Sequence, residues 1–151
     1  MLESELTAKF TASIPEAEWI PIVGGFYGKN GSADRVCVHP KIGIFFIEFK
    51  GFETPIKQHQ LDTLQKLCRL QAQCAFIVRG KGVPVVGPWD DMLKASARGK
   101  KKLAHTGWIL YMADGSEIGT FATAREVMNC IAKYREDCKA ILEKLRDSAG
   151  F

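Results

Sequence analysis

The chain has 151 residues, 46% of them hydrophobic and 25% charged, which is close to an ordinary soluble globular protein and excludes a disordered chain. This length predicts a single domain over residues 1–151 that buries its own core without disulfides or a structural metal. The net charge of +4 is mildly basic and by itself favours a polyanionic partner only weakly.

The first half of the chain predicts, in order, a helix, three strands, a second helix and a fourth strand. Apolar residues recur every fourth position near the N-terminus and indicate an amphipathic helix over residues 2–13. The strands are predicted at residues 19–23, 35–38, 42–49 and 74–78, and the second helix at residues 56–70. Pro21 favours an edge position for the first strand, and the turn 39–41 favours a hairpin between the next two.

The last third of the chain has a different character. Its predicted elements are a loop at 80–87, a helix at 89–97, a hairpin of strands at 108–112 and 118–121, and a helix from Thr123 to about Arg146. Thr123 and Glu126 fit a capping box that opens this helix. The helix carries an apolar stripe of Val127, Ile131, Tyr134, Cys138, Ile141 and Leu145. We expect the stripe to pack on the chain's own sheet, and a two-helix seam is the alternative.

The cysteines and the N-terminal residues favour a particular cellular compartment. Five cysteines are present and none is spaced as Cys-x-x-Cys, so neither a zinc site nor a disulfide framework is expected. Free thiols fit a reducing compartment. Charged residues interrupt any apolar stretch at the N-terminus, and apolar runs elsewhere have the length of strands. We therefore expect a cytoplasmic protein without a membrane partner.

Two charged side chains at the end of the third strand require an explanation. Glu48 and Lys50 point to the same face because side chains alternate along a strand. Ile44 and Phe46 precede them on that face and are expected closer to the core. Burying either charge alone is costly, so the two need each other, a metal ion or solvent at the rim of the sheet. Alone, a Glu-x-Lys pair is more often a simple ion pair.

Asp34 opens the preceding strand, and a hairpin would bring it to the same end of the sheet as Glu48. Two close carboxylates repel unless a cation lies between them, and hard oxygen ligands favour Mg²⁺ or Mn²⁺ over zinc. The carbonyl of Phe49 is a further candidate ligand. Such an ion polarises a phosphoryl oxygen, and Lys50 would orient the attacking water or stabilise the charge that develops on the phosphate. The pattern indicates phosphodiester hydrolysis.

Two segments resemble the PD-(D/E)xK nuclease superfamily, namely Gly31-Ser32-Ala33-Asp34-Arg35 and Phe45-Phe46-Ile47-Glu48-Phe49-Lys50. Within that superfamily the chain is similar to the VRR-NUC (virus-type replication-repair nuclease) family. Glu3 on the first helix and Gln60, ten residues after Lys50, also match that family's pattern. Ala33 stands where the family has a proline, which shapes a turn and carries no chemistry.

The resemblance covers about residues 2–79 and implies an α/β fold. This fold is a PD-(D/E)xK restriction-endonuclease-like core, in which helices flank a central mixed sheet. The resemblance does not extend to residues 80–151, which would add a hairpin and a long helix as a C-terminal extension. Completing the sheet, binding DNA and forming a dimer interface are the three roles open to this extension.

The resemblance also implies an activity, that of a Mg²⁺-dependent endonuclease acting on DNA, with Mn²⁺ as a substitute. The implied site consists of the metal ligands Asp34 and Glu48, the catalytic lysine Lys50, the accessory carboxylate Glu3, and Gln60. Glu5 competes with Glu3 for the role on the helix. Gln60 would contact the lysine, the water or the backbone of the substrate.

Stand-alone members of the resembled family act on branched or junction DNA, often as dimers, so the implied partners are DNA and a second copy of the chain. The basic run of Lys94, Arg98, Lys100, Lys101 and Lys102 would contact backbone phosphates. Lys29, in the glycine-rich stretch 24–32, is a further candidate. A solvated basic face is an equally strong reading of the run, and a plain loop is the stronger reading of the stretch.

Two other kinds of function fit the same sequence. One is a non-catalytic nucleic-acid-binding module on the same fold, which would have no need to keep a costly charge cluster. The other is a nuclease toxin or defence enzyme, which shares the chemistry and differs in biology. An RNA substrate also stays open, because no feature of the sequence distinguishes the sugar.

Overall fold

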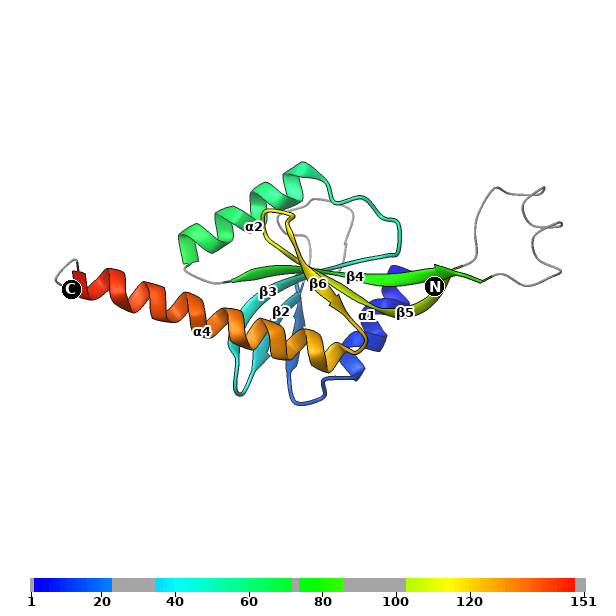
Figure 1. Cartoon of the computed structure of the whole chain (residues 1–151), viewed down its shortest axis with the longest axis horizontal. Helices are drawn as coiled ribbons and strands as arrows, with labels where there is room; N and C mark the ends of the chain where they lie inside the picture. Colours follow the sequence, from blue (N-terminus) through cyan, green and yellow to red (C-terminus); the bar gives the residue numbers. More distant parts are fainter. Residues whose placement is uncertain (1, 23–34, 72–73, 86–102, 149–151) are drawn as a thin grey trace.

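A six-stranded sheet forms the centre of the fold (Figure 1). The computed structural model describes residues 2–22, 35–71, 74–85 and 103–148. The strands, in chain order and also in order of pairing, are β1 (Glu18–Pro21), β2 (Arg35–His39), β3 (Gly43–Lys50), β4 (Ala75–Pro84), β5 (Leu103–Met112) and β6 (Glu117–Phe121). The helices of the described residues are α1 (Glu3–Ala12), α2 (Gln58–Gln71) and α4 (Ala124–Ser148). The predicted general class, α/β with a mixed sheet, is confirmed.

Within the described residues, β3 and β4 are the parallel pair, and the other neighbouring strands are antiparallel. Parallel neighbours need a crossover connection, and α2 supplies it between β3 and β4. Figure 1 shows α2 on one face of the sheet and α1 and α4 on the other. The order α1-β1-β2-β3-α2-β4 is the one predicted for the first half of the chain.

Alternate residues of β4 face two separate hydrophobic clusters. Phe76 and Val78 belong to the larger cluster, which includes residues of α1 and α4. Ala75 and Ile77 belong to the smaller cluster, together with Leu64 of α2. Because both faces of the strand are covered, its sequence is a continuous apolar run rather than an alternating one.

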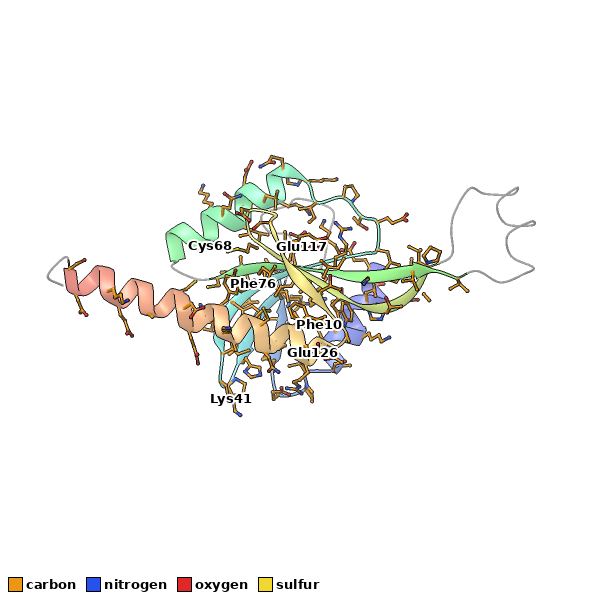
Figure 2. All side chains as sticks on the ribbon, viewed as in Figure 1. Phe10, Lys41, Cys68, Phe76, Glu117 and Glu126 are labelled. Atoms are coloured by element: carbon orange, nitrogen blue, oxygen red, sulfur yellow. The ribbon has the colours of Figure 1, made fainter. Side chains whose placement is uncertain are left out.

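Phe10 of α1 is fully buried in the larger cluster. Its ring centroid lies 5.3 Å from that of Phe49 and 5.1 Å from that of Trp108, the latter edge-on. Figure 2 shows the Phe10 and Phe76 side chains between the layers and Lys41 at the periphery. These aromatic contacts hold α1 against the sheet, and they therefore set where the first residues of α1 lie relative to β3.

The turn between β2 and β3 is closed by His39 and Gly43. His39 Nδ1 accepts hydrogen bonds from the backbone N–H groups of Lys41 and Ile42, at 3.1 and 3.2 Å. Gly43 has a φ of +94°, a conformation that favours glycine. The turn predicted at residues 39–41 is confirmed, although β3 begins at Gly43 and not at Ile42.

The predicted loop at 80–87 is wrong over its first part, because β4 continues through residues 80–84 and pairs there with β5. At Gly80 a Cβ would lie 2.7 Å from Leu6 Cδ1. At Gly82 it would lie 2.9 Å from Cδ1 of Phe52. These glycines mark places where side chains pack directly on the strand, and they do not break it.

Other elements differ from prediction in length or burial. β5 begins at Leu103, well before the predicted 108, because it pairs with the extended part of β4. Ile44 was expected closer to the core but is 45% exposed, because the cluster formed with α2 does not reach it. The helix predicted at 89–97 and the loop at 24–32 lie outside the described residues.

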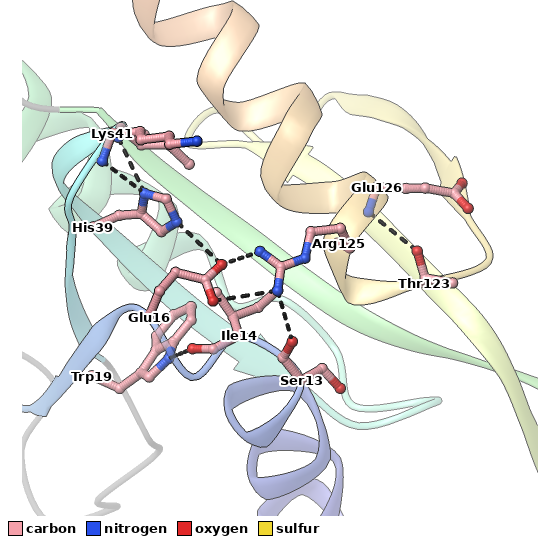
Figure 3. A network of polar contacts seen from close by, with 10 residues as sticks. Ser13, Ile14, Glu16, Trp19, His39, Lys41, Thr123, Arg125 and Glu126 are labelled. Atoms are coloured by element: carbon pink, nitrogen blue, oxygen red, sulfur yellow. Dashed lines mark hydrogen bonds and ion pairs between the residues drawn. The ribbon is translucent and has the colours of Figure 1, made fainter.

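The apolar stripe of α4 packs on the chain's own sheet over the part whose side chains are described. Val127 and Ile131 are fully buried, and Tyr134 packs against the same cluster. The Glu126 backbone N–H donates to Thr123 Oγ1 at 3.2 Å, so the predicted cap at the start of the helix is confirmed (Figure 3).

Two further expectations concern the cysteines and the helices. All five cysteines are free, and burial raises the pKa of the Cys37 thiol to about 12. Among the helices in the described ranges, none has both the length and the apolar character needed to cross a membrane.

Candidate active site

Glu48 and Lys50 lie at the end of β3, on the face of the sheet that α2 covers. The Glu48 side chain has no exposed surface, and the Lys50 side chain is 4% exposed. Lys50 Nζ lies 3.4 Å from Glu48 Oε1. The structure therefore brings together the two residues that strand alternation placed on one face, and buries both charges.

Gln60, in the first turn of α2, joins this pair. Its Nε2 donates a hydrogen bond of 2.7 Å to Glu48 Oε1, and its own Oε1 accepts one of 3.2 Å from the Lys57 backbone N–H. A backbone N–H can donate only to the oxygen of the side-chain amide, so the NH₂ group of Gln60 must face the carboxylate. The sequence predicted that Gln60 contacts the lysine, the water or the substrate. The structure places it on Glu48, because α2 packs directly over the end of β3.

The burial of Glu48 and Lys50 has an energetic cost that their contacts must offset. Removing each charge from water costs several kcal/mol even after the protein relaxes. A hydrogen bond to a charged group contributes about 1.5–3 kcal/mol. A well-packed apolar pair is often at least as stable as a buried ion pair. A buried charge pair that a third polar side chain joins is therefore a candidate functional site.

Glu3 lies at the start of α1, beside the chain that follows Lys50. A Cβ built on Gly51 would be 3.8 Å from Glu3 Cβ. Glu5 is used differently, since its Oε2 accepts a hydrogen bond of 3.1 Å from the Leu2 backbone N–H and caps the helix. Of the two carboxylates that the sequence left in competition, Glu3 lies beside this part of the chain and Glu5 caps its own helix. The accessory role of Glu3 stays a prediction.

Several predicted site residues lie outside the described residues: Asp34, Lys29, Lys94, Arg98, Lys100, Lys101 and Lys102. Their roles stay predictions. Arg35, the first described residue of β2, pairs with Ile47, which directly precedes Glu48. The side chain of Phe49 belongs to the larger hydrophobic cluster, and the role of its backbone carbonyl as a metal ligand stays a prediction.

Two contributors to this site were missed in the sequence. One is the backbone N–H of Lys57, which orients Gln60 and cannot be recognised without the turn that precedes α2. The other is Arg79, which follows the apolar run of β4 and stands in register with Lys50 of β3. A charge at the end of a second apolar strand was the available indication, because parallel strand ends meet at one edge of the sheet.

A separate pocket of about 300 Å³ lies between α1, β5 and the start of α4. Lys9 Nζ lies 2.9 Å from His105 Nδ1 there, and burial, with the Lys9 charge, lowers the pKa of His105. Arg125 is paired with Glu16, and this hydrogen bond lowers the Glu16 pKa to about 2 (Figure 3). Because both cations already have partners, the pocket offers little free charge to a ligand.

No match to this chain is found among protein-family models, curated proteins or solved structures. Within the described part of the chain, no three His, Cys, Asp or Glu side chains are grouped as metal ligands. The buried set of Glu48, Lys50 and Gln60 at the end of β3 is therefore the feature on which a function can be argued.

Proposed function

We propose that this protein is a metal-dependent nuclease of the PD-(D/E)xK type that hydrolyses phosphodiester bonds in DNA. The observation that carries the proposal is the buried pair of Glu48 and Lys50, which Gln60 joins from α2. The order α1-β1-β2-β3-α2-β4 around a mixed sheet supports it, because the resemblance of the sequence implies a core of helices around such a sheet.

The chemistry of the donor set suits Mg²⁺ or Mn²⁺. A carboxylate is a hard oxygen ligand, and Glu48 would share the ion with Asp34 and with the Phe49 carbonyl. Arg35, the residue that follows Asp34 in the sequence, is the first residue of β2. An ion at Glu48 would bind a carboxylate whose Oε1 already contacts Lys50 and Gln60.

Each residue would have a distinct task in hydrolysis. The bound ion would polarise a phosphoryl oxygen and lower the pKa of a water. Lys50 would orient the attacking water and stabilise negative charge on the phosphate in the transition state. Gln60 holds the Glu48 carboxylate in place, and Glu3 would hold a water from the side of α1.

Branched or junction DNA is the substrate class that we favour, by analogy with the resembled family. A homodimer would present two such sites to a branched substrate. Residues 94–102 would contact backbone phosphates without reading the base sequence. The cytoplasm is the expected compartment.

A non-catalytic nucleic-acid-binding module is the second candidate, and one observation favours it. Glu48 has no exposed surface, and its Oε1 is engaged by both Lys50 and Gln60. A nuclease must admit an ion to this buried carboxylate, whereas a binding module has no need to. The two candidates therefore differ in whether a metal ion changes the surroundings of Glu48.

The test is cleavage of labelled linear duplex, single-stranded and four-way-junction DNA with Mg²⁺, with Mn²⁺ and with EDTA. We expect cutting with either metal, none with EDTA, and the fastest cutting on the junction. Binding of DNA without cutting in any metal would favour the binding module instead. An RNA strand of the same sequence, run alongside, tests whether the sugar matters.

A further inference from the structure

Arg79 is the last residue of the apolar run in β4 and lies directly beside Lys50 in the parallel pairing of β3 and β4. Both side chains project from the face of the sheet that α2 covers, since residues in register on parallel strands share a face. A second cation next to Lys50 would be unfavourable without acceptors of its own. The contacts of Arg79 show which acceptors these are.

The guanidinium of Arg79 binds the backbone that follows Lys50. Its Nη1 donates to the carbonyl of Thr54 at 2.7 Å, and it lies 3.2 and 3.4 Å from the carbonyls of Gly51 and Phe52. The contact with Thr54 is the shortest of the three, and because Nη1 carries two hydrogens, the three carbonyls have to share them. One side chain thus holds three carbonyls of a segment that has no helix or strand structure.

The guanidinium is held on a second side by Tyr111 of β5. Arg79 Cζ lies 5.8 Å from the centroid of the Tyr111 ring, within the range of a cation–π contact. The guanidinium group is planar, so an aromatic face and in-plane acceptors can engage it together, which a lysine ammonium cannot reproduce. Arg79 therefore has a defined orientation on the sheet.

The segment that Arg79 holds connects the residues of the candidate site. It begins at Lys50 and ends at Lys57, whose backbone N–H orients Gln60. Gly51, at its start, lies against Glu3, because a Cβ there would be 3.8 Å from Glu3 Cβ. The separation of Lys50 from Gln60 depends on the path of this segment, which also passes beside Glu3.

We propose that Arg79 is a positioning residue, which fixes residues 51–54 and thereby sets the geometry of Lys50 and Gln60 around Glu48. It acts through the backbone and need not touch the substrate. Its effect on cleavage rests on the proposed nuclease function. Its effect on the orientation of Gln60 does not, so the two ideas can fail separately.

The experiment compares Arg79→Gln and Arg79→Lys with Arg125→Gln. Arg125 is the control, because its guanidinium also binds a backbone carbonyl, that of Ser13, together with the carboxylate of Glu16. It lies far from Gln60 in sequence and on the other face of the sheet. Arg79→Lys keeps the charge but lacks the planar guanidinium that binds the carbonyls. It replaces Arg79→Gln in the experiment if Arg79→Gln does not fold.

The first readout is independent of catalysis. It is the rate of hydrogen exchange of the Gln60 side-chain amide, measured by NMR. The signal of this amide is identified by its absence from the spectrum of Gln60→Leu. We expect Arg79→Gln to speed this exchange by about tenfold and Arg79→Lys by less, because the segment that leads to Gln60 is released. Arg125→Gln should leave it unchanged.

The second readout is the rate of DNA cleavage under single-turnover conditions, corrected for the folded fraction. Arg79→Gln should lose roughly tenfold to a hundredfold in rate, since small misplacements of reacting groups have effects of that size. The proposal is overturned if Arg79→Gln and Arg125→Gln lose similar stability while Arg79→Gln keeps the wild-type rates of Gln60 exchange and of cleavage. If wild type cuts nothing, the nuclease proposal fails and the exchange alone decides on Arg79.

Discussion

Gln60 Nε2 donates a hydrogen bond of 2.7 Å to Glu48 Oε1 and so joins α2 to β3 inside the protein. The other end of the same amide is held by the Lys57 N–H at 3.2 Å. The amide is thus fixed as a donor to the carboxylate and is not free to turn. Because this contact serves both the packing of α2 and the geometry of Glu48, stability and site geometry are coupled here.

Replacement of Gln60 by leucine is expected to destabilise the protein by about 1–3 kcal/mol, because it removes a donor from a buried carboxylate. Urea unfolding measures the change. Gln58→Leu is the matched control on the same helix, since the Gln58 amide bonds Asp62 at an exposed position, and it should change stability by less than about 0.5 kcal/mol. Equal losses of stability in the two variants would show that the hydrogen bond from Gln60 to Glu48 contributes no more than an exposed one.

A double substitution of Glu48 and Lys50 should leave the protein stable but without cleavage activity. Lys50→Met alone leaves the buried carboxylate without its cation and should cost about 3–5 kcal/mol. Adding Glu48→Gln should restore most of that stability, because two neutral side chains of similar volume then replace the ion pair. Cleavage should be absent in both proteins. Full activity in the stable double variant would contradict the assigned roles.

The pair of Glu16 and Arg125 predicts a pH dependence of stability. The Arg125 hydrogen bond lowers the pKa of Glu16 from 4.5 to about 2, so the ionised carboxylate favours the folded state. This stabilisation is complete above pH 4.5 and is lost as the pH falls toward 2. The difference in unfolding free energy between wild type and Glu16→Gln should therefore shrink over this interval. A constant difference would mean that the pair does not form in solution.

The aromatic core around Phe10 should be sensitive to truncation. Phe10→Ala removes a fully buried ring that contacts Phe49 and Trp108, and we expect a loss of about 3–5 kcal/mol in the free energy of unfolding. Ile20→Ala, at a position that is 45% exposed, should cost much less. Denaturant unfolding of both variants is the measurement. A small effect at Phe10 would show that α1 is not docked as described.

The order of elements was predictable because strand and helix periods are local properties of the sequence. Glu48 and Lys50 could be placed on one face from alternation alone, and Thr123 could be placed as a cap from its spacing to Glu126. The contact from Gln60 to Glu48 required the docking of α2, which no local pattern contains.

The errors have a common physical cause. Gly80 and Gly82 favoured a loop because glycine has no side chain to pack in a strand. In the fold, the side chains of Leu6 and Phe52 occupy that space, so glycine permits the strand instead of ending it. The contacts of Arg79 were missed for a similar reason, because its acceptors are backbone carbonyls, which every residue type has.

The most direct test of the central claim is single-turnover cleavage of the best substrate in Mg²⁺ by wild type and by Glu48→Gln. This substitution keeps the shape of the side chain and removes the charge that would bind the ion. Because a catalytic ion contributes several kcal/mol to the transition state, we expect the rate to fall by about a thousandfold or more. Glu117→Gln, on the exposed side of β6, should cut at the wild-type rate. A folded Glu48→Gln variant that cuts as fast as wild type would contradict the account.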